Sequence, residues 1–240
     1  MCLTTRSTST SGSAKPVEVC LASQAAAGAL TERFFQIVSA NQQVLPLLKR
    51  IEALRIADWY LAGGCLFQTV WNHLHGFAPE HGILDYDLLY FDDSSLSESD
   101  EGRVQAAVGA ACAQLPVRIE VCNQARVHQW YEAKWHVRSP PFRRCSDGID
   151  AFLACCCSVG IRQSADGLAL YAPHGLQDLF NLVVRPNPSR SWQGARLAAA
   201  YREKTLRWKS IWPRLEIVPW PADGAEADSV ALPTGFEPVY

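Results

Sequence analysis

The stretch GILDYDLLYFDD, Gly82–Asp93, has the apolar character of a buried β-strand but carries Asp85 and Asp87 two positions apart. Side chains at positions i and i+2 of a strand share one face and lie about 6.6 Å apart along it. Two charges about 6 Å apart repel each other by roughly 2.8 kcal/mol at an effective dielectric constant near 20. The pair therefore predicts either two divalent cations held between the carboxylates or a solvated strand end where basic residues or a turn compensate them.

The segment before this stretch predicts a phosphate-binding turn. Residues 58–62 form a short strand pattern, Gly63 and Gly64 interrupt it, and an apolar helical pattern follows over residues 65–74. Backbone N–H groups at a helix N-terminus are suited to an anionic phosphate. We expect the two glycines to face such a group.

A third acidic residue lies in another predicted strand, VRIEV at residues 117–121. Glu120 falls on the face opposite Val117, Ile119 and Val121, because strand side chains alternate. Three acidic residues and a glycine turn together suggest a site for phosphoryl transfer.

The remaining pattern predicts a mixed α/β (α+β) domain with a central sheet flanked by helices. Two helices are expected between residues 22 and 55, and others at about 95–115, 124–134, 147–156, 175–180 and 193–208. The acidic stretch itself is expected to be a strand over residues 83–91, and further strands are expected near residues 158–163, 168–171 and 182–184. The domain is expected to span residues 21–220, between a disordered tail at 1–20 and a flexible tail at 221–240.

Composition limits the classes of partner. The 22 basic and 24 acidic residues give a net charge of −2, so no global positive field draws the chain to nucleic acid or membrane. No signal peptide, anchor or membrane partner is expected, because the polar N-terminus and the interrupted apolar runs lack their patterns. Nine cysteines without CxxC spacing predict free thiols, no zinc, no disulfide-linked partner and a cytoplasmic location.

Several blocks carry a resemblance to a known family. LAGG at 61–64, DYD at 85–87 and the later strand acid resemble the nucleotidyltransferases of the DNA polymerase beta superfamily. One branch of it, a nucleotidyltransferase-like family similar in fold to the CCA-adding enzyme head domain, is similar over about residues 54–215. Its blocks are CLFQTVWN at 65–72, GILDYDLLYFD at 82–92, NQARVH at 123–128, VGIR at 159–162 and APHGLQDLF at 172–180.

The resemblance implies a metal-dependent enzyme with a polymerase beta-like fold. Asp85 and Asp87 would hold Mg²⁺, or Mn²⁺ in its place, and Glu120 would complete the metal-binding acids near the attacking hydroxyl. That hydroxyl would attack the α-phosphate of an NTP, and pyrophosphate would leave. The acceptor is left open between RNA, protein and a small molecule. The nucleotide-binding residues implied are Gly63, Gly64, Cys65, Gln68, Arg126 and Arg162.

Two departures from the pattern support an alternative function. Cys65 stands where many superfamily members carry serine, and Phe67 stands where the CCA-adding head has arginine. The alternative is a catalytically inactive nucleotide-binding or regulatory module of the same fold. Arg126, which follows a predicted helix cap at Asn123, has two interpretations as well: it faces nucleotide phosphate, or it holds a neighbouring carboxylate.

Overall fold

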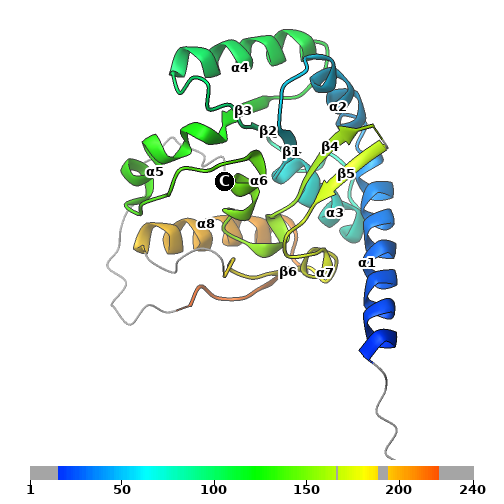
Figure 1. Cartoon of the computed structure of the whole chain (residues 1–240). Helices are drawn as coiled ribbons and strands as arrows, with labels where there is room; N and C mark the ends of the chain where they lie inside the picture. Colours follow the sequence, from blue (N-terminus) through cyan, green and yellow to red (C-terminus); the bar gives the residue numbers. More distant parts are fainter. Residues whose placement is uncertain (1–15, 166, 189–193, 222–240) are drawn as a thin grey trace, which may run out of the picture.

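The structure, a computed structural model, describes residues 16–165, 167–188 and 194–221 (Figure 1). The expected tails at 1–20 and 221–240 lie largely outside these ranges. No helix in the described ranges is both long enough and apolar enough to cross a membrane.

A five-stranded mixed sheet with the order β3-β2-β1-β4-β5 forms the centre of the fold. β1 pairs antiparallel with both β2 and β4, β2 pairs parallel with β3, and β4 pairs antiparallel with β5. The strands are β1 (Trp59–Ala62), β2 (Tyr86–Tyr90), β3 (Ile119–Asn123), β4 (Gly160–Ser164) and β5 (Gly167–Tyr171). A second, two-stranded parallel sheet consists of β6 (Val183–Val184) and β7 (Glu216–Ile217).

Helices surround the sheet, and α4 lies alongside β3 at one of its edges (Figure 1). In the same view α5 lies between α4 and α8. The helices are α1 (Pro16–Ser39), α2 (Val44–Ala53), α3 (Gly64–His75), α4 (Glu98–Cys112), α5 (Val127–Trp135), α6 (Cys145–Asp150), α7 (Gln177–Phe180) and α8 (Ala195–Ile211). Two 3₁₀ turns complete the set, η1 (Gln124–Arg126) and η2 (Cys155–Cys157).

The register of β2 sets the level of the acidic residues. All five residues of β2, an inner strand of the sheet, are buried, so both faces of the sheet are covered at this strand. Asp87 is paired with Ala62 of β1 and with Glu120 of β3. Two of the three predicted acids are therefore direct cross-strand neighbours, whose side chains share one face of the sheet.

An aromatic cluster joins α3 to α8 and so closes the fold. The ring of Trp71 lies 4.7 Å from Phe67, 5.5 Å from Trp208 and 5.3 Å from Trp212, between ring centroids. The indole Nε1 of Trp212 donates a hydrogen bond of 2.7 Å to Asn72 Oδ1. These contacts place α8 against α3, the helix that follows the glycine turn.

The mixed α/β class is confirmed, and the differences lie at element boundaries. β2 begins at Tyr86 rather than Ile83, because the chain still turns at Gly82, where φ is +72°. The helix expected over 147–156 ends at Asp150. There the chain extends, and Ala154 bridges to Pro186 before η2 begins. β7 was not expected at all, because two residues are too short for a periodicity.

The cysteines confirm the prediction of free thiols in the part of the chain whose side chains are described. Seven of them are free, and all but Cys122 are buried. The run at 155–157 lies in the core, as expected of small apolar side chains.

Candidate active site

A cavity of about 310 Å³ brings together most of the predicted site. This volume lies at the lower end of the usual range for small-molecule pockets. The predicted residues that line it come from the start of α3, the start of β2 and the middle of β3. They are Gly63, Gly64, Gln68, Asp85, Asp87 and Glu120.

Asp87 is the least solvated of the three acids, with 5% of its surface exposed. Burial raises the pKa of its carboxyl group well above the ordinary value, and the charges of Asp85 and Glu120 raise it further. Its Oδ1 atom is buried and makes no hydrogen bond to any described residue. A buried carboxylate oxygen without a donor is costly, so this position suits a bound cation.

Gly63 leaves room for the carboxylate of Asp87. Its φ is +73°, a conformation that residues with a side chain rarely adopt, and a Cβ there would lie 2.6 Å from Asp87 Oδ2. Gly64 begins α3, so the first backbone N–H groups of that helix, which have no partner within it, lie at the cavity. The backbone of the glycine turn and the carboxylate of Asp87 are thus neighbours in the cavity.

Gln68 covers the second glycine. A Cβ on Gly64 would lie 2.9 Å from Gln68 Nε2. The other amide atom, Oε1, is buried without a hydrogen-bond partner among the described residues. The side chain therefore keeps one acceptor available at the cavity, which is consistent with a role in binding a ligand.

Glu120 lies beside Asp87 and also forms an ion pair with Arg118, which projects toward solvent. Within the described ranges, no three or more His, Cys, Asp or Glu side chains are arranged to hold one metal ion as they stand. The carboxylate oxygens of Asp85 and Asp87, with the orphaned Oδ1 atom, nevertheless fit a hard divalent ion such as Mg²⁺. Glu120 would join them only by turning away from Arg118.

Lys204 and Arg207 of α8 also line the cavity, although the sequence pattern did not predict a role for them. Lys204 is partly buried, and burial lowers its pKa to about 8, although the charges of Cys157 and Asp87 act in the opposite sense. Arg207 is exposed. Their i, i+3 spacing beside Trp208 was the available signal, since it puts both cations and an aromatic ring on neighbouring positions of one helix.

Three predicted nucleotide-binding residues are not among those lining the cavity. Cys65 is buried in the core, where its Sγ donates to Ala62 O at 3.5 Å. The guanidinium of Arg162 lies 5.0 Å from the centre of the Tyr60 ring. Cys65 and Arg162 therefore make packing contacts in the structure.

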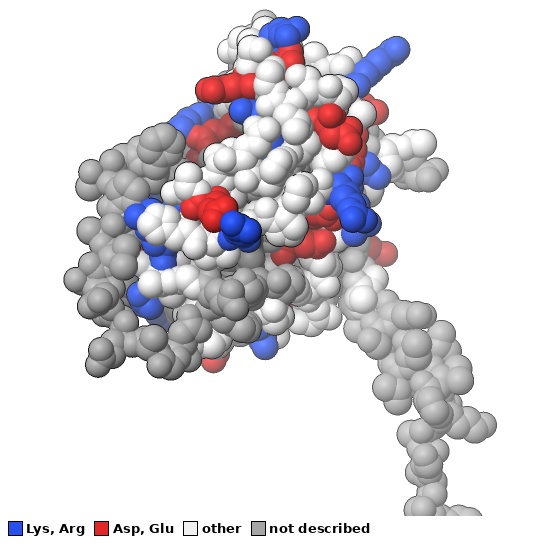
Figure 2. Space-filling view, turned by 60° about the vertical axis from the view of Figure 1, so that its left-hand side comes forward, with Lys and Arg blue, Asp and Glu red and all other residues white. Residues whose placement is uncertain are grey.

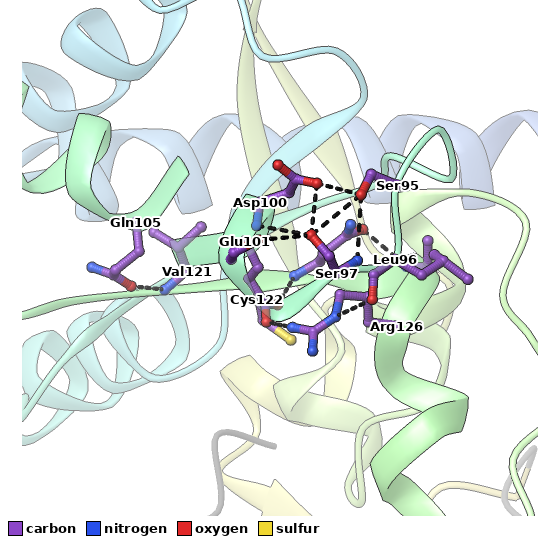
Figure 3. A network of polar contacts seen from close by, with 12 residues as sticks. Ser95, Leu96, Ser97, Asp100, Glu101, Gln105, Val121, Cys122 and Arg126 are labelled. Atoms are coloured by element: carbon purple, nitrogen blue, oxygen red, sulfur yellow. Dashed lines mark hydrogen bonds and ion pairs between the residues drawn. The ribbon is translucent and has the colours of Figure 1, made fainter. Parts of the chain in front are cut away.

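Arg126, the third of these residues, holds a neighbouring carboxylate, as its second interpretation predicted. It forms a largely buried ion pair with Glu101 of α4, and its Nε donates to Leu96 O at 3.0 Å (Figure 3). The guanidinium points at the start of α4, and the first interpretation, in which Arg126 faces nucleotide phosphate, stays a prediction.

The same network fixes β3, the strand that carries Glu120 (Figure 3). Glu101 Oε1 accepts the backbone N–H of Asn123 at 2.7 Å, and Gln105 Oε1 accepts that of Val121 at 2.9 Å. Ser97 caps α4 by accepting the N–H of Asp100. Side chains of α4 thus accept hydrogen bonds from the backbone of β3, the edge strand of the sheet. These bonds fix the position of the strand that carries Glu120.

The described residues on the face in Figure 2 show no single dominant charge. On the face in Figure 2, Lys and Arg side chains alternate with Asp and Glu side chains and with uncharged residues. This agrees with the net charge of −2 and gives no sign, on that face, of the continuous basic surface that long nucleic acids require.

Known proteins resemble this chain in sequence and in fold. A family model described as Nucleotidyltransferase matches residues 49–217, close to the range of the resemblance seen in the sequence. One solved structure, described as "The NMR structure of the protein reveals a CCA-adding enzyme head domain", has a TM-score of 0.65 and 22% identity. The match covers 78% of this chain and 95% of that chain, and it confirms the predicted fold. None of the curated proteins compared matches.

Proposed function

Because the chain belongs to the nucleotidyltransferase family, and so is a nucleotidyltransferase enzyme, we propose that it transfers a nucleoside monophosphate from an NTP to a hydroxyl acceptor. One observation carries the proposal: Asp85, Asp87 and Glu120 line a single cavity together with the glycine turn. The acceptor is an RNA, a protein or a small molecule.

In the proposed reaction the acceptor oxygen forms a bond to the α-phosphorus of the NTP. The bond from that phosphorus to the bridging oxygen breaks, and pyrophosphate leaves on the opposite side. Glu120 lies beside Asp87 and is the carboxylate we assign to the acceptor side, where it takes the hydroxyl proton. The backbone N–H groups at Gly63 and Gly64 bind the phosphate oxygens.

A divalent metal ion is typical of this family, and we assign it to Asp85 and Asp87. When bound, Mg²⁺ would neutralise phosphate charge and make the acceptor hydroxyl easier to deprotonate. Asp87 is held against the backbone of Gly63, so the metal-binding carboxylate and the phosphate-binding turn are fixed relative to each other. This proximity orients the reacting groups before the chemical step.

The inactive-module alternative rested on Cys65 and Phe67. The Cys65 side chain does not line the cavity, so the exchange of a serine for a thiol removes nothing from it. Phe67 does line it, but its ring packs against Trp71 and Trp208. Neither residue displaces a carboxylate. The cytoplasmic location inferred from cysteine usage stays a prediction.

Transfer of label tests the proposal. The protein is incubated with each α-³²P-labelled NTP, Mg²⁺ and a cell extract, and an acceptor should become labelled. The double variant Asp85→Asn/Asp87→Asn should lose this labelling. Asp93→Asn is the matched control, because Asp93 is an exposed acid of the same stretch outside the cavity. Equal labelling by the double variant and the wild type would rule out the mechanism.

A further inference from the structure

The helix α8 supplies two basic residues to the cavity, which is otherwise lined largely by residues from the region of the main sheet and α3. Lys204 and Arg207 lie three positions apart and therefore on neighbouring positions of one helix face. Trp208 and Ile211 line the cavity from the same helix, so one continuous face of α8 is turned toward it. Arg202 is an exposed arginine of the same helix, but it is not among the lining residues.

Aromatic packing holds this face in place. Trp208, the neighbour of Arg207, lies 5.3 Å from the ring of Phe67 and 5.5 Å from that of Trp71. Phe67 in turn stands three residues after Gly64 on the first turn of α3. The same contact that packs α8 on α3 therefore sets the position of the two cations relative to the glycine turn.

The charge of the substrate calls for such cations. A nucleoside triphosphate brings about four negative charges to a cavity that already contains three carboxylates. A metal ion at Asp85 and Asp87 balances only part of that charge, and uncompensated charge in a cavity is costly. The phosphates beyond the reacting one need basic partners, and α8 contributes Lys204 and Arg207 to the cavity that the glycine turn also lines.

We propose that Lys204 and Arg207 bind the β- and γ-phosphates of the NTP and then the pyrophosphate that leaves. This inference rests on the proposed function and adds a second phosphate-binding element to the glycine turn. Arginine suits the role because its planar guanidinium makes paired hydrogen bonds to phosphate, and lysine acts beside it as a compact charge.

A purely structural function for these cations makes a different prediction. If Lys204 only balanced the charge of Asp87, its loss would lower the stability of the fold and leave the affinity for phosphates unchanged. If it binds phosphates, its loss lowers that affinity in the folded protein. A binding measurement on folded variants therefore separates the two.

The probe is inorganic tripolyphosphate with Mg²⁺, which carries the phosphate chain without a base. Its affinity is measured by calorimetry for the wild type and for Lys204→Gln, Arg207→Gln and Arg202→Gln. We expect Lys204→Gln and Arg207→Gln each to weaken binding at least tenfold. The control Arg202→Gln, which removes the same charge from the same helix, should change it less than twofold.

The outcomes distinguish this inference from the proposed function. A wild type that transfers labelled nucleotide while all three variants bind tripolyphosphate with wild-type affinity overturns the role of α8 and leaves the function standing. A wild type that binds neither tripolyphosphate nor any NTP overturns both. If Lys204→Gln fails to fold, Arg207→Gln still tests the role of α8. Arg207 is exposed, so its replacement should not unfold the protein.

Discussion

Gly63 and Asp87 depend on each other, since the carboxylate occupies the space that a side chain at residue 63 would need. Gly63→Ala should destabilise the protein by about 1 to 3 kcal/mol, through backbone strain and displacement of Asp87. Nucleotide transfer should fall at least tenfold. Urea unfolding and the labelling assay measure the two effects. Gly109→Ala on the exposed face of α4 is the control, and it should raise stability by up to about 1 kcal/mol.

Asp87 should be a residue whose removal stabilises the fold and abolishes the reaction. A carboxyl group whose pKa is raised in the folded protein costs stability at neutral pH, where the unfolded chain is ionised. In EDTA, Asp87→Asn should therefore increase the free energy of unfolding, as urea unfolding at neutral pH would measure. Mg²⁺ should raise the melting temperature of the wild type but not that of the variant. A variant less stable than the wild type in EDTA would contradict this assignment.

At the scale of residues, the acids were predictable because a charge in an apolar strand has few explanations. Asp85, Asp87 and Glu120 all line the cavity. Arg126 was ambiguous, because a sequence does not tell which of several carboxylates a guanidinium meets. Lys204 was missed because a lysine on a helix of mixed polarity has no such anomaly until the helix is placed.

At the scale of elements, the ion pair between Glu101 and Arg126 supports the contact of α4 with β3, beside the hydrogen bonds that Glu101 and Gln105 accept from the strand. Glu101 and Arg126 have 19% and 11% of their side chains exposed, so removal of Glu101 leaves a mostly buried cation. Glu101→Gln should lower the free energy of unfolding by about 2 to 4 kcal/mol. The control Arg103→Gln breaks an exposed pair with Asp100 and should cost less than about 1 kcal/mol.

The same prediction separates the two interpretations of Arg126. Arg126→Gln should reduce stability while the folded variant keeps wild-type affinity for tripolyphosphate, because the guanidinium lies at α4 and not among the cavity residues. A folded Arg126→Gln variant with tenfold weaker binding would instead assign it to the nucleotide. Denaturation curves and calorimetry on one preparation give both quantities.

Elements with a clear periodicity were predictable, and short ones were not. The long helices and the strands of the main sheet were expected close to where they lie, because burial on one face imposes a repeat on the residues. β3 begins at Ile119, two residues later than expected, because its first partner on β2 is Tyr86. Pairing with a neighbouring strand sets such a boundary, and the local sequence does not show it.

At the scale of the molecule, the site depends on a contact between distant parts of the chain. The hydrogen bond from Trp212 to Asn72 joins residues 140 positions apart and helps to seat α8 against α3. Asn72 also donates to the carbonyls of Pro79 and His81, in the loop that leads to Asp85. No pattern in the sequence reveals a contact of this separation, which is why the cations of α8 came only from the structure.

Free thiols should make the whole fold independent of redox conditions. The seven cysteines with described side chains form no disulfide bond, and burial raises the pKa of several, including Cys65 and Cys156. We expect the melting temperature to be the same with and without a reducing agent. These seven thiols should react with a thiol reagent mainly on unfolding. A melting temperature that falls on reduction would show a stabilising disulfide and contradict the prediction.

The central claim is tested most directly by a crystal structure with a non-hydrolysable NTP and Mg²⁺. The account predicts a metal ion bound by Asp85 and Asp87, the triphosphate between the Gly63–Gly64 turn and α8, and Glu120 facing the open side of the α-phosphate. A nucleotide bound elsewhere, or one in this cavity with the aspartates bound to no metal, would contradict it.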